Sequence, residues 1–318
     1  MPDEKTGRLD EEYVVQMKGI TKVYPNGVAA NQGVDFNLRR GEIHALMGEN
    51  GAGKSTLMKM LFGLEQPTSG EIWVNGEKLT LSSPTVAISH GIGMVHQHFM
   101  LVPSLTVAEN MVLGMAPRRG LFIDHAKAVA ITKEYAEKYN LHVEPEAKVM
   151  DIPVGMKQKV EILKALVRGA KILILDEPTT GLDPQTRNTL WSVISDLRKN
   201  EKMTVFLTTH YMEEAADADY VIILDNGKIV AKGTPLELKN LYTGDFITIY
   251  GAKEEEIKML GAKYEAIRDA YRVSVPNTAA ATQLILRYPE IFKDYEITKG
   301  KMDDVFLTVT GKKLAGGV

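Results

Sequence analysis

Residues 48–55 constrain this chain more than any other segment, because they read Gly-Glu-Asn-Gly-Ala-Gly-Lys-Ser and match the phosphate-binding pattern G-x-x-x-x-G-K-[S/T]. The preceding residues 42–47 form a short, largely apolar run with the length of a buried strand. Residues 56–62 contain strong helix formers and neither proline nor glycine. A strand, a glycine-rich turn and a helix in this order form a cradle for phosphates, so we expect the chain to bind a nucleoside triphosphate.

The residue types in this loop indicate how the triphosphate would be held. Glycines allow successive backbone N–H groups to point inward, and the helix N-terminus adds a partial positive charge. Lys54 is expected to reach the β- and γ-phosphates, and the hydroxyl of Ser55 to ligate Mg²⁺. The predicted nucleotide-binding residues in this region are Gly48, Glu49, Asn50, Gly51, Ala52, Gly53, Lys54, Ser55 and Thr56.

The composition is that of an ordinary globular protein, with 44% hydrophobic and 25% charged residues. A formal net charge of −3 gives no electrostatic reason to expect nucleic acid as a partner. The chain contains no cysteine, which excludes disulfides and Cys-ligated metal. We find neither a signal peptide nor an apolar run of about 18 residues. We therefore expect a cytoplasmic protein that reaches the membrane only through a partner.

The order of predicted elements indicates an α/β fold. Strands expected at residues 14–23, 34–38, 92–96, 204–209 and 220–224 alternate with helices such as 184–199. Between roughly residues 105 and 166 the apolar residues recur at helical intervals, which predicts a helical subdomain with a surface loop at residues 117–120. Residues 1–10 are charged, and we expect them to form a flexible leader.

The last part of the chain predicts a separate small domain. Strands are expected at residues 246–250 and 271–275, and helices at 254–260 and 279–288. We therefore interpret residues 241–318 as an α+β accessory domain, following a main domain over residues 11–240. It has no recognisable catalytic cluster, so contact with a partner or regulation is its expected role.

Two adjacent carboxylates follow an unbroken apolar run at residues 171–175. Such a run is typical of a central parallel strand that is buried on both faces. Ligands of open α/β sheets bind beyond the carboxyl ends of the strands. We therefore expect Asp176 to hold Mg²⁺, and Glu177 to act as the general base or to position the attacking water.

Together these motifs resemble the ATP-binding-cassette (ABC) ATPases over about residues 12–240. The chain is thus identified as having a P-loop NTPase core of the ABC type, with a Q-loop and helical subdomain over about residues 97–167. The resemblance assigns Gln97 to the Q-loop, residues 180–183 to the D-loop, His210 to the switch position and Tyr24 to the adenine-stacking position. From the residue type alone, Tyr24 could equally belong to the core.

The resemblance also implies the reaction and the partners. It implies ATP hydrolysis with ATP and Mg²⁺, where Glu177, His210 and Gln97 are catalytic and Ser55, Gln97 and Asp176 hold the metal. Two such domains pair head to tail, so a second ATPase subunit, identical or different, is expected. A transmembrane permease subunit is the other expected partner, which would place the chain on the inner face of the cell membrane.

One motif departs from the family pattern. The usual signature Leu-Ser-Gly-Gly-Gln corresponds here to residues 152–156, Ile-Pro-Val-Gly-Met. Gly155 would still allow close approach to the partner's nucleotide, and the helix expected from residue 157 could aim its dipole at phosphate. Pro153 suits a first helical position, but it removes the hydroxyl that would contact the γ-phosphate. This substitution predicts weakened activity at the composite site.

The resemblance leaves the direction of transport open. Residues 90–103, 106–110 and 160–166 resemble nucleoside and simple-sugar importers, whereas residue 180 onward, including 210–215 and 302–311, resembles drug-efflux ATPases. We slightly favour uptake, because the importer-like part is the one that contacts the permease in the family. A drug or antibiotic exporter and a degenerate, non-hydrolytic regulatory subunit are the alternatives.

Overall fold

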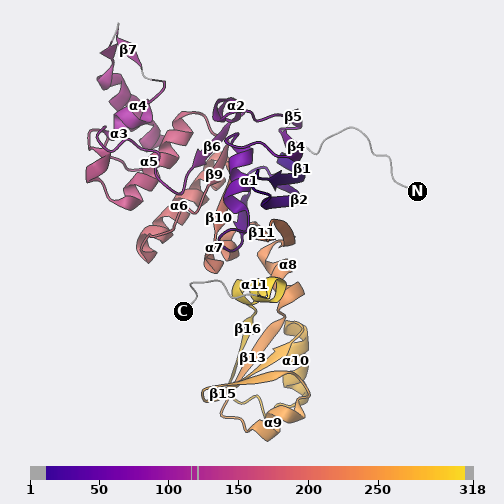
Figure 1. Cartoon of the computed structure of the whole chain (residues 1–318). Helices are drawn as coiled ribbons and strands as arrows, with labels where there is room; N and C mark the ends of the chain where they lie inside the picture. The colour runs from indigo at the N-terminus through magenta and orange to yellow at the C-terminus, as the bar shows by residue number, and fades with distance from the viewer. Residues whose placement is uncertain (1–11, 116, 120–121, 312–318) are drawn as a thin grey trace. The chain divides into compact units, whose positions relative to one another are not determined.

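The computed structural model describes residues 12–115, 117–119 and 122–311 of the chain (Figure 1). The predicted leader at residues 1–10 lies outside this range. The chain divides into two compact units, which are described separately. Unit 1 comprises residues up to 210 together with 224–229, and unit 2 comprises residues 211–223 and 230–318.

An antiparallel sheet forms the first layer of unit 1. Its strands are β1 (Tyr13–Val23), β2 (Ala29–Arg39), β4 (Ser69–Val74) and β5 (Glu77–Leu79), in the order β2-β1-β4-β5. Val15, Met17 and Ile20 of β1 are fully buried, while Lys18 and Gly19 between them are exposed. This sheet therefore has one face in the core and one face in solvent.

Parallel strands form the centre of unit 1. They are β3 (Ile43–Met47), β10 (Thr204–Thr209), β9 (Ile172–Leu175) and β6 (Ile92–Val95), which neighbour one another in this order and run parallel. Every residue of these four strands is buried, as expected where helices cover both faces of a parallel sheet. This confirms the α/β prediction and brings the carboxyl ends of β3, β9 and β10 to one edge of the sheet.

Helices account for most of the remainder of unit 1. They are α1 (Lys54–Leu61), α2 (Pro84–Ser89), α3 (Val107–Met111), α4 (His125–Lys138), α5 (Val154–Val167) and α6 (Pro184–Glu201), with a 3-10 turn at Val149–Asp151. The helices α3, α4 and α5 contact one another and form the predicted helical region (Figure 1). The loop predicted at residues 117–120 is wrong in part, because β7 (Arg118–Arg119) pairs with β8 (Phe122–Ile123). Residue 120 of the predicted loop lies outside the described residues.

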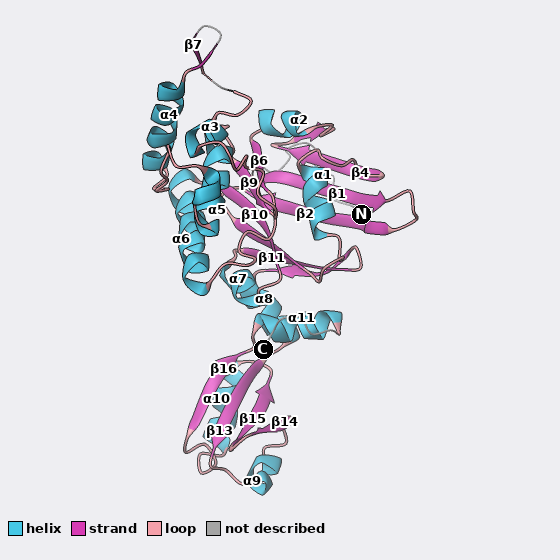
Figure 2. Ribbon diagram, turned by 60° about the vertical axis from the view of Figure 1, so that its left-hand side comes forward, coloured by secondary structure: helices cyan, strands magenta, loops and turns pink. Residues whose placement is uncertain are grey.

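Unit 2 contains a second antiparallel sheet with the order β14-β15-β13-β16. Its strands are β13 (Asp245–Tyr250), β14 (Tyr264–Ile267), β15 (Ala270–Val275) and β16 (Tyr295–Lys299), and its helices are α7 (Met212–Asp217), α8 (Pro235–Tyr242), α9 (Glu254–Met259), α10 (Thr278–Arg287) and α11 (Met302–Thr310). The order β-α-β-β-α-β from β13 to β16 is that of ferredoxin-like domains. The helix α10 packs on one face of this sheet (Figure 2).

Two strands have residues in both units, β11 (Tyr220–Asp225) and β12 (Lys228–Gly233). Within the sheet of unit 2, sequence patterns identified β13 and β15 but missed β14 and β16. The missed strands are the two edges, and their side chains are mostly exposed. Edge strands such as these lack the apolar run that marks a buried strand.

None of the helices in the described residues is both long and apolar enough to span a bilayer.

We predict that the stability of unit 1 depends on pH through His44 of β3. Its Nε2 accepts a hydrogen bond from the Arg39 N–H at 3.2 Å. Glu42 Oε2, at 3.0 Å from the same nitrogen, favours the protonated ring. Burial outweighs this effect and, with the Arg39 charge, lowers the pKa of His44 to about 4. The unfolded chain binds this proton near pH 6.5, so stability is complete above that pH and falls as the pH decreases toward 4, by about 2 kcal/mol or more.

Urea denaturation at pH 7.5 and pH 5.0 measures this effect. The wild type should lose more stability between the two pH values than His44→Gln, which cannot titrate. Equal losses in both proteins would contradict the assignment.

Candidate functional site

The loop between β3 and α1 is held in place by close backbone contacts that only glycine permits. Gly53 has φ = +103°, and a Cβ atom there would lie 2.1 Å from the Ala30 carbonyl oxygen. A Cβ atom on Gly48 would lie 2.5 Å from the Leu224 carbonyl oxygen. Two of the predicted loop glycines are therefore required by the fold itself, apart from any ligand.

The side chain of Lys54, at the first position of α1, folds back over the loop. Its Nζ donates hydrogen bonds to the carbonyl oxygens of Gly48 at 2.7 Å and Glu49 at 3.1 Å, and lies 3.7 Å from Glu177 Oε1. Burial lowers the pKa of the Lys54 ammonium, and the carboxylates of Glu177 and Asp176 oppose this effect. The positively charged Lys54 side chain is thus only 4% exposed and lies inside the curve of the loop backbone.

Asp176 follows the last residue of β9 and is 5% exposed. Its Oδ1 accepts hydrogen bonds from Ser55 Oγ at 3.1 Å and from Thr208 Oγ1 at 2.8 Å. The structure thus places the predicted serine and aspartate ligands side by side. A hydroxyl and a carboxylate are the hard oxygen donors that Mg²⁺ prefers, so the residues present fit this metal.

Glu177 is the point on which the remaining predicted catalytic residues converge. Its Oε2 accepts hydrogen bonds from Gln97 Nε2 at 3.1 Å and Thr180 Oγ1 at 3.4 Å. Its Oε1 lies 3.8 Å from His210 Nδ1 and 3.7 Å from Lys54 Nζ. The glutamine follows β6, the glutamate follows β9 and the histidine follows β10, so adjacent parallel strands bring them together.

A cleft of about 800 Å³ lies over the loop, a size suitable for a small-molecule ligand. The sequence-predicted residues that line it are Tyr24, Glu49, Asn50, Gly51, Gly53, Lys54, Ser55, Thr56, Gln97 and Glu177. The predicted residues Gly48, Ala52, Asp176, His210 and Gly155 are not among the lining residues. Of these, Asp176 and His210 reach the cleft through their contacts with Ser55 and Glu177.

Tyr24 lies at the edge of the cleft, half-buried and outside the core. Its hydroxyl donates to Glu65 Oε1 at 2.9 Å and lies 3.3 Å from Thr56 Oγ1. The ammonium of Lys22 lies 5.2 Å from the ring centroid. The ring is therefore anchored at its hydroxyl end while the half-buried side chain lines the cleft.

No sequence motif predicts the residues that form one wall of the cleft. This wall consists of Val28, Ala29, Ala30, Gln32, Asn226 and Gly227. Residues 226–227 are a recognisable turn, yet only the fold places them against the loop, where the Gly227 N–H donates to the Ala52 carbonyl at 3.0 Å. Long-range contacts of this kind leave no local pattern.

The signature-like segment begins α5 and lies apart from the cleft. Pro153 is the N-cap of α5, so the helix begins at Val154 and not at residue 157, and the proline precedes the first helical position. It has no side-chain capping hydrogen bond. A Cβ atom on Gly155 would lie 2.4 Å from Thr186 Cγ2, so packing against α6 already requires this glycine.

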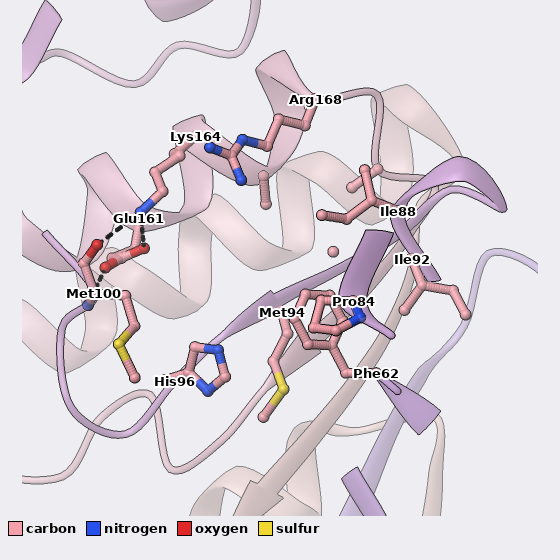
Figure 3. A pocket seen from close by; sticks show the side chains of 13 residues that line it. Phe62, Pro84, Ile88, Ile92, Met94, His96, Met100, Glu161, Lys164 and Arg168 are labelled. Carbon is pink, nitrogen blue, oxygen red and sulfur yellow. Dashed lines mark hydrogen bonds and ion pairs between the residues drawn. The ribbon is translucent and has the colours of Figure 1, made fainter. Parts of the chain in front are cut away.

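A second, smaller pocket of about 170 Å³ lies beside the segment that follows β6 (Figure 3). Its apolar wall includes Phe62, Ile88 and Met94, and its polar wall comes from α5. On α5, Glu161 accepts a hydrogen bond from the Met100 N–H at 2.5 Å, and Lys164 Nζ donates to the Met100 carbonyl at 2.9 Å. These bonds fasten the segment after Gln97 to α5.

Comparison with protein families and with curated proteins gives a consistent result. The model of the ABC transporter family matches residues 31–180. The guanosine import ATP-binding protein NupO of Bacillus subtilis (strain 168) is 49% identical over 217 residues, covering 68% of this chain and 42% of that protein. The nucleoside import ATP-binding protein NupA of Lactococcus lactis subsp. cremoris (strain MG1363) is 43% identical over 271 residues, covering 82% of this chain and 53% of that protein. The chain thus spans about half the length of these relatives.

Solved structures show the same similarity. CbiO1 from Clostridium perfringens, described as part of the ABC transporter complex cbiONQ, matches with 25% identity and a TM-score of 0.62, covering 71% of this chain and 90% of that chain. The ATP-binding cassette MJ0796, in a dimeric post-hydrolysis state with ADP and Pi, matches with 27% identity and a TM-score of 0.59. The match covers 69% of this chain and 98% of that chain.

We predict that Gly53→Ala abolishes binding of a nucleoside triphosphate. The added methyl group would collide with the Ala30 carbonyl and displace the loop. Gly114→Ala is the matched control, because Gly114 also has a positive φ (+84°), but none of the described atoms lies within 4 Å of the point where its Cβ atom would be. Its cost is limited to backbone strain of about 1–2 kcal/mol. Titration with a fluorescent nucleotide checks this, and normal binding by Gly53→Ala would contradict it.

Proposed function

Because this chain belongs to the family of ABC transporter ATP-binding proteins, we propose that it hydrolyses ATP to drive a separate membrane permease. The observation that carries this proposal is the convergence of Gln97, Lys54 and His210 on Glu177, next to the Ser55–Asp176 pair. An ion pair with a purely structural role would not need a histidine and a glutamine beside the Glu177 carboxylate. Nor would it need two further oxygen groups suited to a metal at the same edge of the sheet.

The chemistry follows from these positions. The backbone N–H groups of residues 48–55 and the ammonium of Lys54 would bind the phosphates, and Tyr24 would stack on the adenine. Ser55, Asp176 and Gln97 would hold Mg²⁺, which neutralises charge on the phosphates when bound. Glu177 would accept a proton from the attacking water or hold it in line, and His210 would keep that carboxylate and the water oriented.

We further propose that the complete site forms between two ATPase subunits. Gly155 and the N-terminus of α5 do not line the chain's own cleft, which supports a role toward a nucleotide on another subunit. The half-exposed Val154 beside them is consistent with such a contact surface. Pro153 offers no hydroxyl to the partner's γ-phosphate, which would reduce the rate of hydrolysis at that site.

The permease is proposed to dock beside the segment that follows Gln97. The pocket there combines an apolar wall with Glu161, Lys164 and Arg168, and Met100, which also lines it, is 58% exposed. Docking would place the chain on the inner face of the cell membrane. The boundary proposed near residue 240 would leave the ferredoxin-like sheet outside this machinery, as a contact or regulatory domain.

Uptake of nucleosides or simple sugars is the direction we favour. NupO and NupA are named as guanosine and nucleoside import proteins. The alignments with NupO and NupA do not cover the whole of this chain. From residue 180 onward the sequence resembles efflux ATPases, so drug export is the second candidate. Transport by cells that express the chain with its permease distinguishes them: ATP-driven accumulation of a labelled nucleoside supports uptake, and ATP-driven loss of a labelled drug from preloaded cells supports export.

We predict that Glu177→Gln retains ATP binding but lowers kcat by about 100-fold or more, because the amide cannot accept a proton. A coupled assay of phosphate release with the chain and its permease measures kcat. Thr189→Ala, which removes an exposed hydroxyl on α6, is the control. An unchanged kcat in Glu177→Gln would eliminate the proposed role of this carboxylate.

We predict that Pro153→Ser raises kcat by about tenfold, the value of one hydrogen bond to a charged group. Val154→Ser, which adds a hydroxyl one residue later, should not raise it. If neither the wild type nor Pro153→Ser hydrolyses ATP while both bind it, the chain is a non-hydrolytic regulatory subunit.

A further inference from the structure

Thr208 connects the two carboxylate residues of the site through one buried hydroxyl. Its Oγ1 donates to Asp176 Oδ1 at 2.8 Å and accepts a hydrogen bond from the Glu177 N–H at 2.8 Å. The residue has no exposed surface, so it cannot touch a bound nucleotide. Its effect must pass through the two residues that it holds.

Strand pairing explains why a side chain is needed at this point. The register of β10 with β9 ends at Leu207 and Leu175, and Thr208 continues only along β3, opposite Leu46. Beyond Leu175 the chain turns away, and the Asp176 N–H donates to the Val95 carbonyl of β6. The next N–H group, that of Glu177, is held by the threonine hydroxyl in place of a strand carbonyl.

Glu177 also has an unfavourable backbone conformation. Its φ of +49° is in the left-handed region, which typically costs a residue with a side chain about 1–3 kcal/mol unless the surroundings fix it. Left-handed geometry here turns the carboxylate toward Gln97 and Lys54. The hydrogen bond to Thr208 is the contact that fixes the backbone N–H of this strained residue.

We propose that Thr208 is a positioning residue for ATP hydrolysis, which sets the Asp176 carboxylate and the Glu177 backbone in one fixed relation. The Thr208 hydroxyl has a single proton, which it donates to Asp176, so only its oxygen lone pairs are left to accept from the Glu177 N–H. The two hydrogen bonds therefore fix the positions of Asp176 and Glu177 relative to the same oxygen atom. This inference rests on the proposed function, in which Asp176 holds the metal and Glu177 acts on water.

The same strand supplies a matched control. Thr204, at the opposite end of β10, is 1% exposed and also makes two hydrogen bonds, accepting from the Gly41 N–H at 2.9 Å and donating to the Arg39 carbonyl at 3.5 Å. Thr204→Val therefore removes an equivalent buried hydroxyl from the same strand without touching the site.

The experiment compares Thr208→Val, Thr208→Ser and Thr204→Val, with Thr208→Ala as a second deletion of the hydroxyl should the valine variant fold poorly. Steady-state hydrolysis gives kcat and KM for ATP, and a Mg²⁺ titration gives the concentration for half-maximal activity. Loss of a hydrogen bond to a charged group corresponds to a decrease in kcat of about tenfold or more. We expect this decrease in Thr208→Val with KM little changed, a raised Mg²⁺ requirement, and recovery in Thr208→Ser.

Two results would overturn the inference: a Thr208→Val enzyme with the kcat and Mg²⁺ requirement of Thr204→Val, or a Thr208→Ser enzyme as defective as Thr208→Val. Absence of hydrolysis that depends on Glu177 in the wild type would refute the proposed function instead. Calorimetric titration of ATP with and without Mg²⁺ then tests Thr208 independently. A smaller gain in affinity from Mg²⁺ in Thr208→Val than in Thr204→Val supports its role, and equal gains refute it.

Discussion

The buried Asp176 carboxylate and its two hydroxyl donors are the interaction on which the arrangement of the site depends. Ser55 lies on α1 after the phosphate-binding loop, and Thr208 lies on β10, so the carboxylate connects three segments that are far apart in the sequence. An ionised group with 5% exposure is unfavourable without such partners. Its position at the end of β9 therefore fixes where the loop, the metal ligands and Glu177 can meet.

Parallel strands make this meeting possible. The strands β6, β9, β10 and β3 all end at the same edge of their sheet, and each is followed by a residue of the site: Gln97, Asp176 with Glu177, His210, and the loop. Backbone contacts at Gly53 and Gly48 hold the loop against residues far along the chain. A strained Glu177 is tolerated because Thr208 and Gln97 bond its backbone and side chain.

The sequence predicted the parts of this site that have local patterns. The loop motif, the apolar run before Asp176 and the helical region around α4 each occupy one continuous segment, and the structure contains all three. It could not predict Thr208, because one threonine in a buried strand resembles any other, as Thr204 on the same strand illustrates. The wall at Asn226 and Gly227 and the packing of Gly155 on Thr186 were also missed, since both depend on contacts between distant segments.

A structure of the Glu177→Gln variant with ATP and Mg²⁺ tests the central claim most directly. We predict that the triphosphate lies in the loop of residues 48–55, that the metal contacts the Ser55 hydroxyl and lies beside Asp176, and that the γ-phosphate lies among Lys54, Gln97 and residue 177. A nucleotide bound elsewhere on the chain, or a metal held by other residues, would contradict the account.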